Sequence, residues 1–90
     1  MVGGYGDASV TSKDVKRAAT FAVTHQVGYK LVKIEKAQQQ VVAGMNYRVC
    51  MQVRKGRGPV KTVQAVIFQS LKNRLSTSEW HMGGCPEMDR

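Results

Sequence analysis

The chain has 90 residues, of which 42% are hydrophobic and 22% charged, a composition typical of a small soluble globule. A chain of this length buries only about 60% of its unfolded surface, so we expect a single domain over residues 1–90, with a thin core and no deep catalytic cleft. No apolar run approaches the roughly 20 residues that span a bilayer, which excludes a membrane protein, and the formal net charge of +8 favours acidic or polyanionic partners.

The N-terminal part of the sequence predicts an arm followed by a helix. Residues 1–9 are rich in glycine, which predicts a flexible arm. From Thr11 the pattern becomes helical, because Thr11 and Ser12 offer a hydroxyl cap and Asp14 adds an acid in the first turn. Apolar residues then recur at helical spacing, and Gly28 is expected to end the helix. We therefore predict one amphipathic helix of about four turns.

Four strand-like segments joined by short connections follow the helix. They are residues 29–39, 45–54, 60–70 and 75–82. In the first segment Val32 and Ile34 are expected on one face, with Lys33 and Glu35 on the other. The second segment alternates strictly between apolar and polar residues, which predicts a strand with one buried and one solvated face. Connections too short for crossovers predict an α+β fold, with the helix across the apolar face of an antiparallel sheet.

The segment Gln40-Val41-Val42-Ala43-Gly44 lies between two of these strands, at the expected tip of a hairpin. Hairpin tips are usually polar, whereas this one is apolar and ends in a glycine that permits the turn. Exposed apolar patches on a small domain often mark contact surfaces. The pattern leaves one alternative open, a long strand pair with a buried turn.

The same five residues match the Q-x-V-x-G signature of the cystatin family. The start of the chain, the helix segment 15–23 and residues 44–47 also resemble secreted animal cystatins. The resemblance is convincing over residues 2–54. Over residues 60–85 it consists only of strands in the expected order. It implies a cystatin-like fold, with one helix packed across a four- to five-stranded antiparallel sheet whose first short strand lies in residues 5–10. It also implies reversible competitive inhibition of papain-like cysteine proteases, such as papain and cathepsins, rather than an enzymatic activity.

The resemblance further implies which residues contact the protease. The N-terminal arm and two hairpins would enter the protease cleft as a wedge, without presenting a bond to be cut. Val2 would fill the apolar S2 pocket, and Gly3, next to Gly4, would be the bending point of the arm. The first hairpin, Gln40 to Gly44, would cover the primed side of the cleft.

The second hairpin departs from the family pattern. Cystatins usually carry Pro-Trp at its tip, whereas this chain has Leu71 in the corresponding turn and a single tryptophan, Trp80, in the last strand. We expect Leu71 to substitute for the missing residue and Trp80 to be a packed or half-exposed aromatic. Because an aromatic anchor contributes on the order of 2 kcal/mol, we expect weaker inhibition than that of a typical animal cystatin.

The only cysteines are Cys50 and Cys85, which leave two alternatives open. One disulfide between them would stabilise the domain by about 3 to 4 kcal/mol, provided that the C-terminal tail, residues 83–90, folds back over the sheet. Two free thiols in a reducing compartment are the alternative. The histidines His25 and His81 are expected on the surface, and the sequence predicts no metal site, no cofactor and no catalytic constellation.

The lysines and arginines are spread along the chain without a block of like charges, which favours an ordinary solvated basic surface. A basic polyanion-binding module on a cystatin-like fold is the competing function. Arg54, Lys55, Arg57 and Lys61 would then grip phosphates or sulfates. The few aromatic residues and the lack of a ribonucleoprotein-type motif argue against sequence-specific nucleic acid binding.

Location and oligomeric state are expectations from the same resemblance. The residues after Met1 form no basic leader and no apolar stretch, so either a signal peptide was removed or the protein is cytosolic. We expect a secreted or extracellular protein, with a cytoplasmic location as the alternative. A monomer is expected, and a dimer that exchanges arms through an opened hairpin is the alternative.

Overall fold

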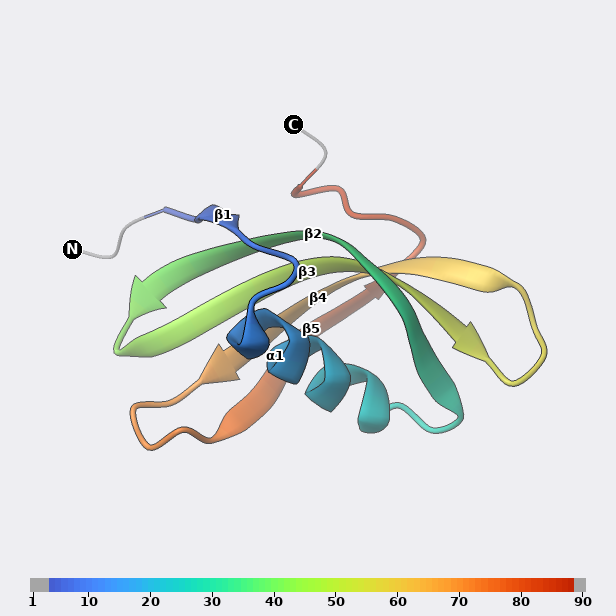
Figure 1. The fold of residues 1–90 in the computed structure, drawn as a ribbon, viewed down its shortest axis with the longest axis horizontal. Helices are drawn as coiled ribbons and strands as arrows, with labels where there is room; N and C mark the ends of the chain where they lie inside the picture. Colours follow the sequence, from blue (N-terminus) through green and yellow to red (C-terminus); the bar gives the residue numbers. More distant parts are fainter. Residues whose placement is uncertain (1–3, 89–90) are drawn as a thin grey trace.

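The structure, a computed structural model, describes residues 4–88, in which one helix and five strands follow one another. They are β1 (Gly6–Ala8), α1 (Lys13–Thr24), β2 (Tyr29–Val42), β3 (Gly44–Lys55), β4 (Val60–Gln69) and β5 (Leu75–Met82). The strands form one antiparallel sheet in the order β1-β2-β3-β4-β5, and α1 lies across one face of it (Figure 1). The expected α+β fold, with one helix across a five-stranded antiparallel sheet and a short first strand, is therefore confirmed.

Helix α1 begins as the sequence predicts but ends earlier. Ser12 is the N-cap, and its hydroxyl accepts a hydrogen bond from the backbone N–H of Val15 at 3.4 Å. The prediction that the helix continues to Gly28 is wrong. His25 is the C-cap, and after it the backbone N–H of Gln26 donates to the Val23 carbonyl only three residues earlier, which tightens the last turn and ends the helix. Gly28 instead has a φ of +81° and directs the chain into β2.

The core lies between α1 and the facing side of the sheet. Every second residue of β3 from Tyr47 to Val53 is buried there, as the alternation predicts. The other buried core residues of the helix and of β4 are Val15, Ala18, Ala19, Ala22, Val23, Val63, Ala65 and Ile67. Because the helix contributes mostly alanines, it can approach the sheet closely.

Strand β2 departs from simple alternation. Its register with β3 shifts twice, and the residues left unpaired are Val32 and Glu35. Each shift is a bulge that inserts one extra residue and turns the following side chains to the other face. Leu31 and Ile34 consequently pack against the core, whereas Val32 is 50% exposed. The prediction that Val32 and Ile34 share one face is therefore wrong.

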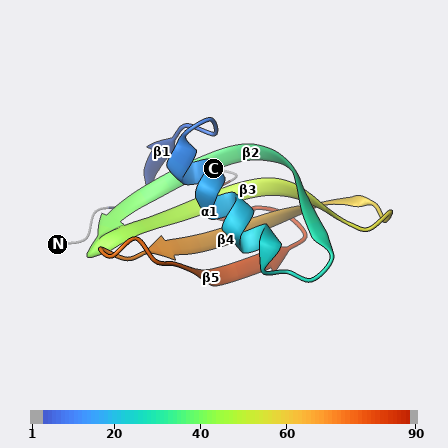
Figure 2. The same cartoon turned by 60° about the horizontal axis from the view of Figure 1, so that its bottom comes forward.

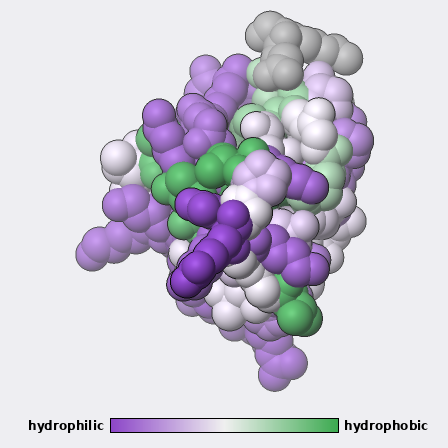
Figure 3. All heavy atoms as spheres, turned by 90° about the vertical axis from the view of Figure 1, so that its right-hand side faces the viewer, coloured by the Kyte–Doolittle hydropathy of each residue, from purple (hydrophilic) through white to green (hydrophobic). Residues whose placement is uncertain are grey.

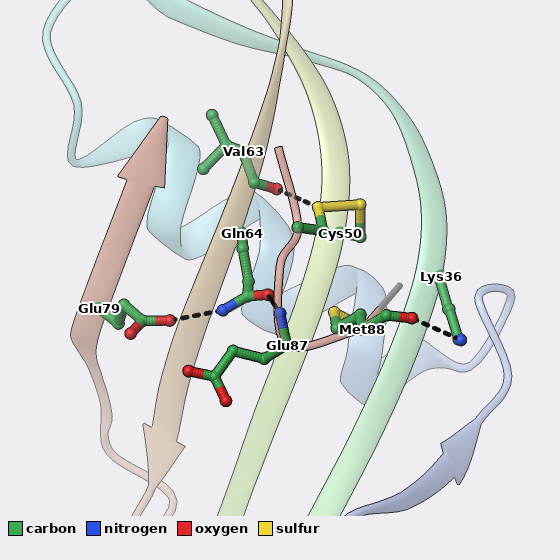
Figure 4. Close-up of a disulfide and its surroundings, with 8 residues drawn as sticks. Lys36, Cys50, Val63, Gln64, Glu79, Glu87 and Met88 are labelled. Carbon is green, nitrogen blue, oxygen red and sulfur yellow. Dashed lines mark hydrogen bonds between the residues drawn. A yellow bond between two sulfur atoms is a disulfide. The ribbon is translucent and has the colours of Figure 1, made fainter. Parts of the chain in front are cut away.

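The segment after β5 folds back over the face of the sheet opposite the helix. Cys85 forms a disulfide with Cys50, with an S–S distance of 2.03 Å, so the alternative of two free thiols does not hold. Met88 is buried, and its carbonyl accepts a hydrogen bond from the Lys36 ammonium at 2.8 Å. Figure 4 shows this arrangement on the outer face of β2, β3 and β4. The described part of the predicted tail is thus fixed against the sheet rather than free.

The buried amide of Gln64 completes the attachment of this segment. Its nitrogen donates to a Glu79 carboxylate oxygen at 2.9 Å, and its oxygen accepts from the backbone N–H of Glu87 at 3.0 Å (Figure 4). The Cys85 sulfur lies 3.5 Å from the Val63 carbonyl oxygen. Since a disulfide sulfur carries no hydrogen, this is a van der Waals contact.

Candidate functional site

The three segments of the expected wedge lie at the same end of the sheet. The β2–β3 turn, the β4–β5 turn and the segment that leads into β1 share the left-hand end in both Figure 1 and Figure 2. The structure therefore brings together Gly4, Gln40–Gly44 and Leu71, although Leu71 is far from the other residues in sequence. We call this set the binding edge.

The segment before β1 is fastened to the outer face of the sheet. The Arg48 guanidinium carbon lies 3.8 Å from the centre of the Tyr5 ring. Burial raises the pKa of the Tyr5 hydroxyl above its ordinary value, and the nearby Arg48 charge offsets part of that effect. The predicted flexible arm is thus wrong for residues 5–8, which are held by this contact and by strand pairing. Val2 and Gly3 lie outside the described residues.

The tip of the β2–β3 hairpin is tight and exposed. Strand pairing continues to Val42 opposite Gly44, so Ala43 alone connects the two strands. The Val41 side chain is 67% exposed, Ala43 is exposed and Val42 is partly buried. The alternative of a buried turn is therefore wrong, and the tip presents apolar surface to the solvent.

Gly44 is the position at this tip where a side chain does not fit. Its φ is +119°, and a Cβ there would lie 2.3 Å from the Gln69 carbonyl oxygen and 3.0 Å from the Phe68 ring. The tip therefore rests directly on the end of β4. On the other side of the tip, the Asn46 amide donates a hydrogen bond to the Gln40 side-chain oxygen at 3.1 Å. Both contacts hold the hairpin in one shape.

We expect Gly44→Ala to lower the free energy of unfolding by at least about 2 kcal/mol, because it adds a backbone collision to a strained φ. The matched control is Gly56→Ala, since Gly56 also has a positive φ, of +56°, but has open space around it. The control should cost about 1 kcal/mol in the same urea unfolding experiment. Equal losses would mean that the contact with Gln69 does not constrain the tip.

The second turn presents Leu71, whose side chain is 83% exposed. Asn73 adopts a φ of +68° and closes the turn through its N–H, which donates to the Ser70 carbonyl at 2.9 Å. The Arg17 guanidinium of α1 donates to the Asn73 carbonyl at 3.0 Å and so ties the turn to the helix. The sequence gives no signal for this contact, because Arg17 reads as an ordinary solvated residue of the helix.

Trp80 takes no part in the binding edge. It lies in β5, partly buried, with its ring in edge contact with Tyr29 at 5.9 Å between centroids. The prediction of a packed or half-exposed aromatic is confirmed. Leu71 is therefore the large apolar residue that the β4–β5 turn presents.

A second feature of the described chain lies away from the binding edge. A hollow of about 770 Å³ lies beside the disulfide, and Tyr29, Lys61 and Thr62 contribute to its lining. Between residues 4 and 88 no group of three or more His, Cys, Asp or Glu side chains could hold a metal ion. The same residues contain no helix that is long and apolar enough to span a membrane.

Comparison with known sequences gives a consistent set of relatives. A family model of the cystatin domain matches residues 3–82. Cystatin of Pseudonaja textilis is 36% identical over 78 residues, which cover 79% of this chain and 55% of the relative. L-cystatin of Tachypleus tridentatus is 48% identical over 54 residues, which cover 52% of this chain and 41% of the relative. The chain thus spans about half the length of the curated relatives it matches.

Solved structures show the same fold. The salivary cystatin of the soft tick Ornithodoros moubata aligns with a TM-score of 0.78 at 22% identity, covering 90% of this chain and 97% of the other. Mialostatin, a gut cystatin of the hard tick Ixodes ricinus, aligns with a TM-score of 0.79 at 17% identity, covering 90% and 98%.

Proposed function

Because this chain belongs to the cystatin family, whose members are protease inhibitors and not enzymes, we propose that it inhibits papain-like cysteine proteases reversibly and competitively. The observation that carries the proposal is the juxtaposition of Gly4, the exposed apolar tip around Val41 and the exposed Leu71 at one end of the sheet. A narrow apolar edge of this kind suits insertion into a cleft.

The rigidity of the binding edge supports the proposal, because a rigid edge can bind without burying a large area. Protease–inhibitor interfaces bury about 800 Å² per partner, and their affinity depends on how little freedom is lost on docking. The β2–β3 tip is held by strand pairing up to Val42 and by the close approach of Gly44 to Gln69. The turn that carries Leu71 is held by Asn73 and Arg17.

The same pairing explains how the tip would escape cleavage. A protease cuts a segment that lies extended through its cleft, whereas Val42 and Gly44 are paired with each other across the tip. In our proposal Gln40–Gly44 covers the primed side of the cleft. Val2 fills the apolar S2 pocket, and Gly3 and Gly4 let the arm bend towards it.

Leu71→Ala should weaken inhibition of papain about tenfold, because it removes the largest apolar side chain of the second turn. Its neighbour Lys72 is also exposed, so Lys72→Ala is the control and should change the inhibition constant less than threefold. Inhibition constants from initial rates with a fluorogenic peptide substrate would measure both. An unchanged constant for Leu71→Ala would remove the second turn from the interface.

The proposed function is tested by titrating active papain with the protein and then diluting the mixture. We expect activity to disappear at about one inhibitor per enzyme and to return on dilution, with the mass of the inhibitor unchanged after long incubation. Permanent loss of activity or cleavage of the inhibitor would contradict reversible inhibition by an uncut wedge.

We further propose that the protein is secreted and acts as a monomer formed by one domain. The disulfide supports an oxidising compartment. The structural neighbours are described as a salivary and a gut protein of ticks, and secretion of this chain would agree with such locations. Size-exclusion chromatography with light scattering would distinguish the monomer from a dimer that exchanges arms.

A further inference from the structure

Positive charge is concentrated at the end of the sheet opposite the binding edge. Half of the chain's 14 lysines and arginines lie within residues 28–36 and 52–62, where Glu35 is the single acid. Six of them form what we call the basic end: Lys30, Lys33, Arg54, Lys55, Arg57 and Lys61. Figure 3 looks onto this end, where strongly hydrophilic side chains gather around small apolar areas.

The bulge of β2 at Val32 creates part of this charge arrangement. Lys30 pairs with Arg54 and Lys33 with Gln52, and cross-strand partners point to the same face of a sheet. Arg54 follows the buried Val53, so this face is the one turned away from the helix. Lys30, Lys33 and Arg54 therefore form a cationic group on the outer face, with the two lysines about 7 Å apart along the strand, because they lie opposite residues two positions apart.

Few of these charges are neutralised by the protein itself. Among the described residues the one ion pair joins Lys33 to Glu35, at 3.8 Å and largely exposed. The Arg54 guanidinium donates to the backbone carbonyl of Arg57 at 3.4 Å, which places the Arg54 charge beside the β3–β4 turn that carries Arg57. Positive charges that are not neutralised by acids give this end a positive potential, so an anionic ligand would bind here with a favourable electrostatic energy.

Protection of the sheet edge explains only part of the pattern. β1 pairs with β2 at residues 37–39, so the first half of β2 is an edge, and lysines and bulges are common means of preventing edge-to-edge aggregation. This accounts for Lys30 and Lys33. It does not account for Arg54, which lies on the inner strand β3, or for Arg57 in the β3–β4 turn.

We propose that the basic end binds a linear sulfated polysaccharide. A flexible chain of sulfates can follow cations spread over both faces of a hairpin, and the hollow beside Lys61 and Thr62 offers room for a sugar ring. The disulfide supports a compartment outside the cytosol, where such polymers occur. Single-stranded nucleic acid would need an aromatic stacking surface, whereas the Tyr29 ring is in contact with Trp80 and lies beneath the Lys55 ammonium.

The basic end and the binding edge lie at opposite ends of the sheet (Figure 1), so one molecule could hold a protease and the polysaccharide together. This inference does not rest on the proposed inhibition. Loss of either property leaves the other testable.

The test uses the full chain, a heparin octasaccharide as the probe and calorimetric titration at several salt concentrations. The variant Arg54→Gln/Arg57→Gln should bind the probe about tenfold more weakly, and the slope of log affinity against log salt should fall by about two. The control Lys13→Gln/Lys16→Gln removes the same charge from exposed positions of α1 and should bind like the parent. Thermal unfolding would establish that both variants are folded.

Three results would overturn the proposal. Equal weakening in both variants would mean that net charge alone attracts the probe. Equal binding of desulfated heparin, or tighter binding of duplex DNA, would mean that the surface does not select a sulfated polysaccharide.

Discussion

Val41→Asp is expected to raise the inhibition constant for papain by at least about 100-fold. Val41 is 67% exposed at the tip of the β2–β3 hairpin, so the substitution leaves the core intact. In the complex the same position would be desolvated, and an unpaired carboxylate buried at an interface costs several kcal/mol. Loss of a central apolar contact alone removes about 2 to 4 kcal/mol. Initial-rate titration with a fluorogenic substrate measures the change.

The matched control for this prediction is Val27→Asp. Val27 is 89% exposed in the link between α1 and β2, at the far end of the sheet from the tip, and the substitution makes the same change of charge and volume. It should alter the inhibition constant less than twofold. A similar weakening by both variants would show that added negative charge, rather than the hairpin tip, controls the affinity.

Removing the disulfide should lower the free energy of unfolding by about 4 kcal/mol. Cys50 and Cys85 are 35 residues apart, and a crosslink over a loop of this length restricts the unfolded chain by about that amount. The double variant Cys50→Ala/Cys85→Ala avoids a leftover thiol. Urea unfolding of the variant and of the parent, with and without reductant, would measure the loss.

This prediction would be contradicted if other contacts near the disulfide were enough to hold the segment after β5. Gln64 and Lys36 also hold the segment after β5, through hydrogen bonds to Glu87 and Met88. A loss below about 1 kcal/mol would mean that these bonds keep the segment in place without the crosslink. We expect the folded variant to inhibit papain like the parent, because the disulfide lies away from the binding edge.

Local sequence patterns predict the strands of this protein well. Strict alternation from Met45 to Arg54 identifies β3, and the apolar segment between two strands identifies the tip at Gln40–Gly44. Both are properties of neighbouring residues, which the period of a strand and the chemistry of a turn make visible. The hydroxyl cap expected from Thr11 and Ser12 is supplied by Ser12, and this signal is local for the same reason.

Features that depend on contacts distant in sequence escape such patterns. The bulge at Val32 depends on which residues of β2 pack against the core. A prediction from simple alternation therefore places Val32 on the wrong face of the sheet. The helix ends at Thr24 rather than near Gly28, and beyond it the Gln26 N–H donates to the Val23 carbonyl three residues earlier instead of four. Arg17, which ties α1 to the β4–β5 turn, looks like any other solvated cation in the sequence.

The most direct test of the central proposal is the steady-state kinetics of papain at several fixed concentrations of this protein, with the substrate varied across its KM. If the binding edge occupies the active-site cleft, the apparent KM will rise with inhibitor concentration while kcat stays constant. A fall in kcat at unchanged KM would place the protein outside the cleft, and an absence of any effect at micromolar concentration would contradict inhibition of papain itself.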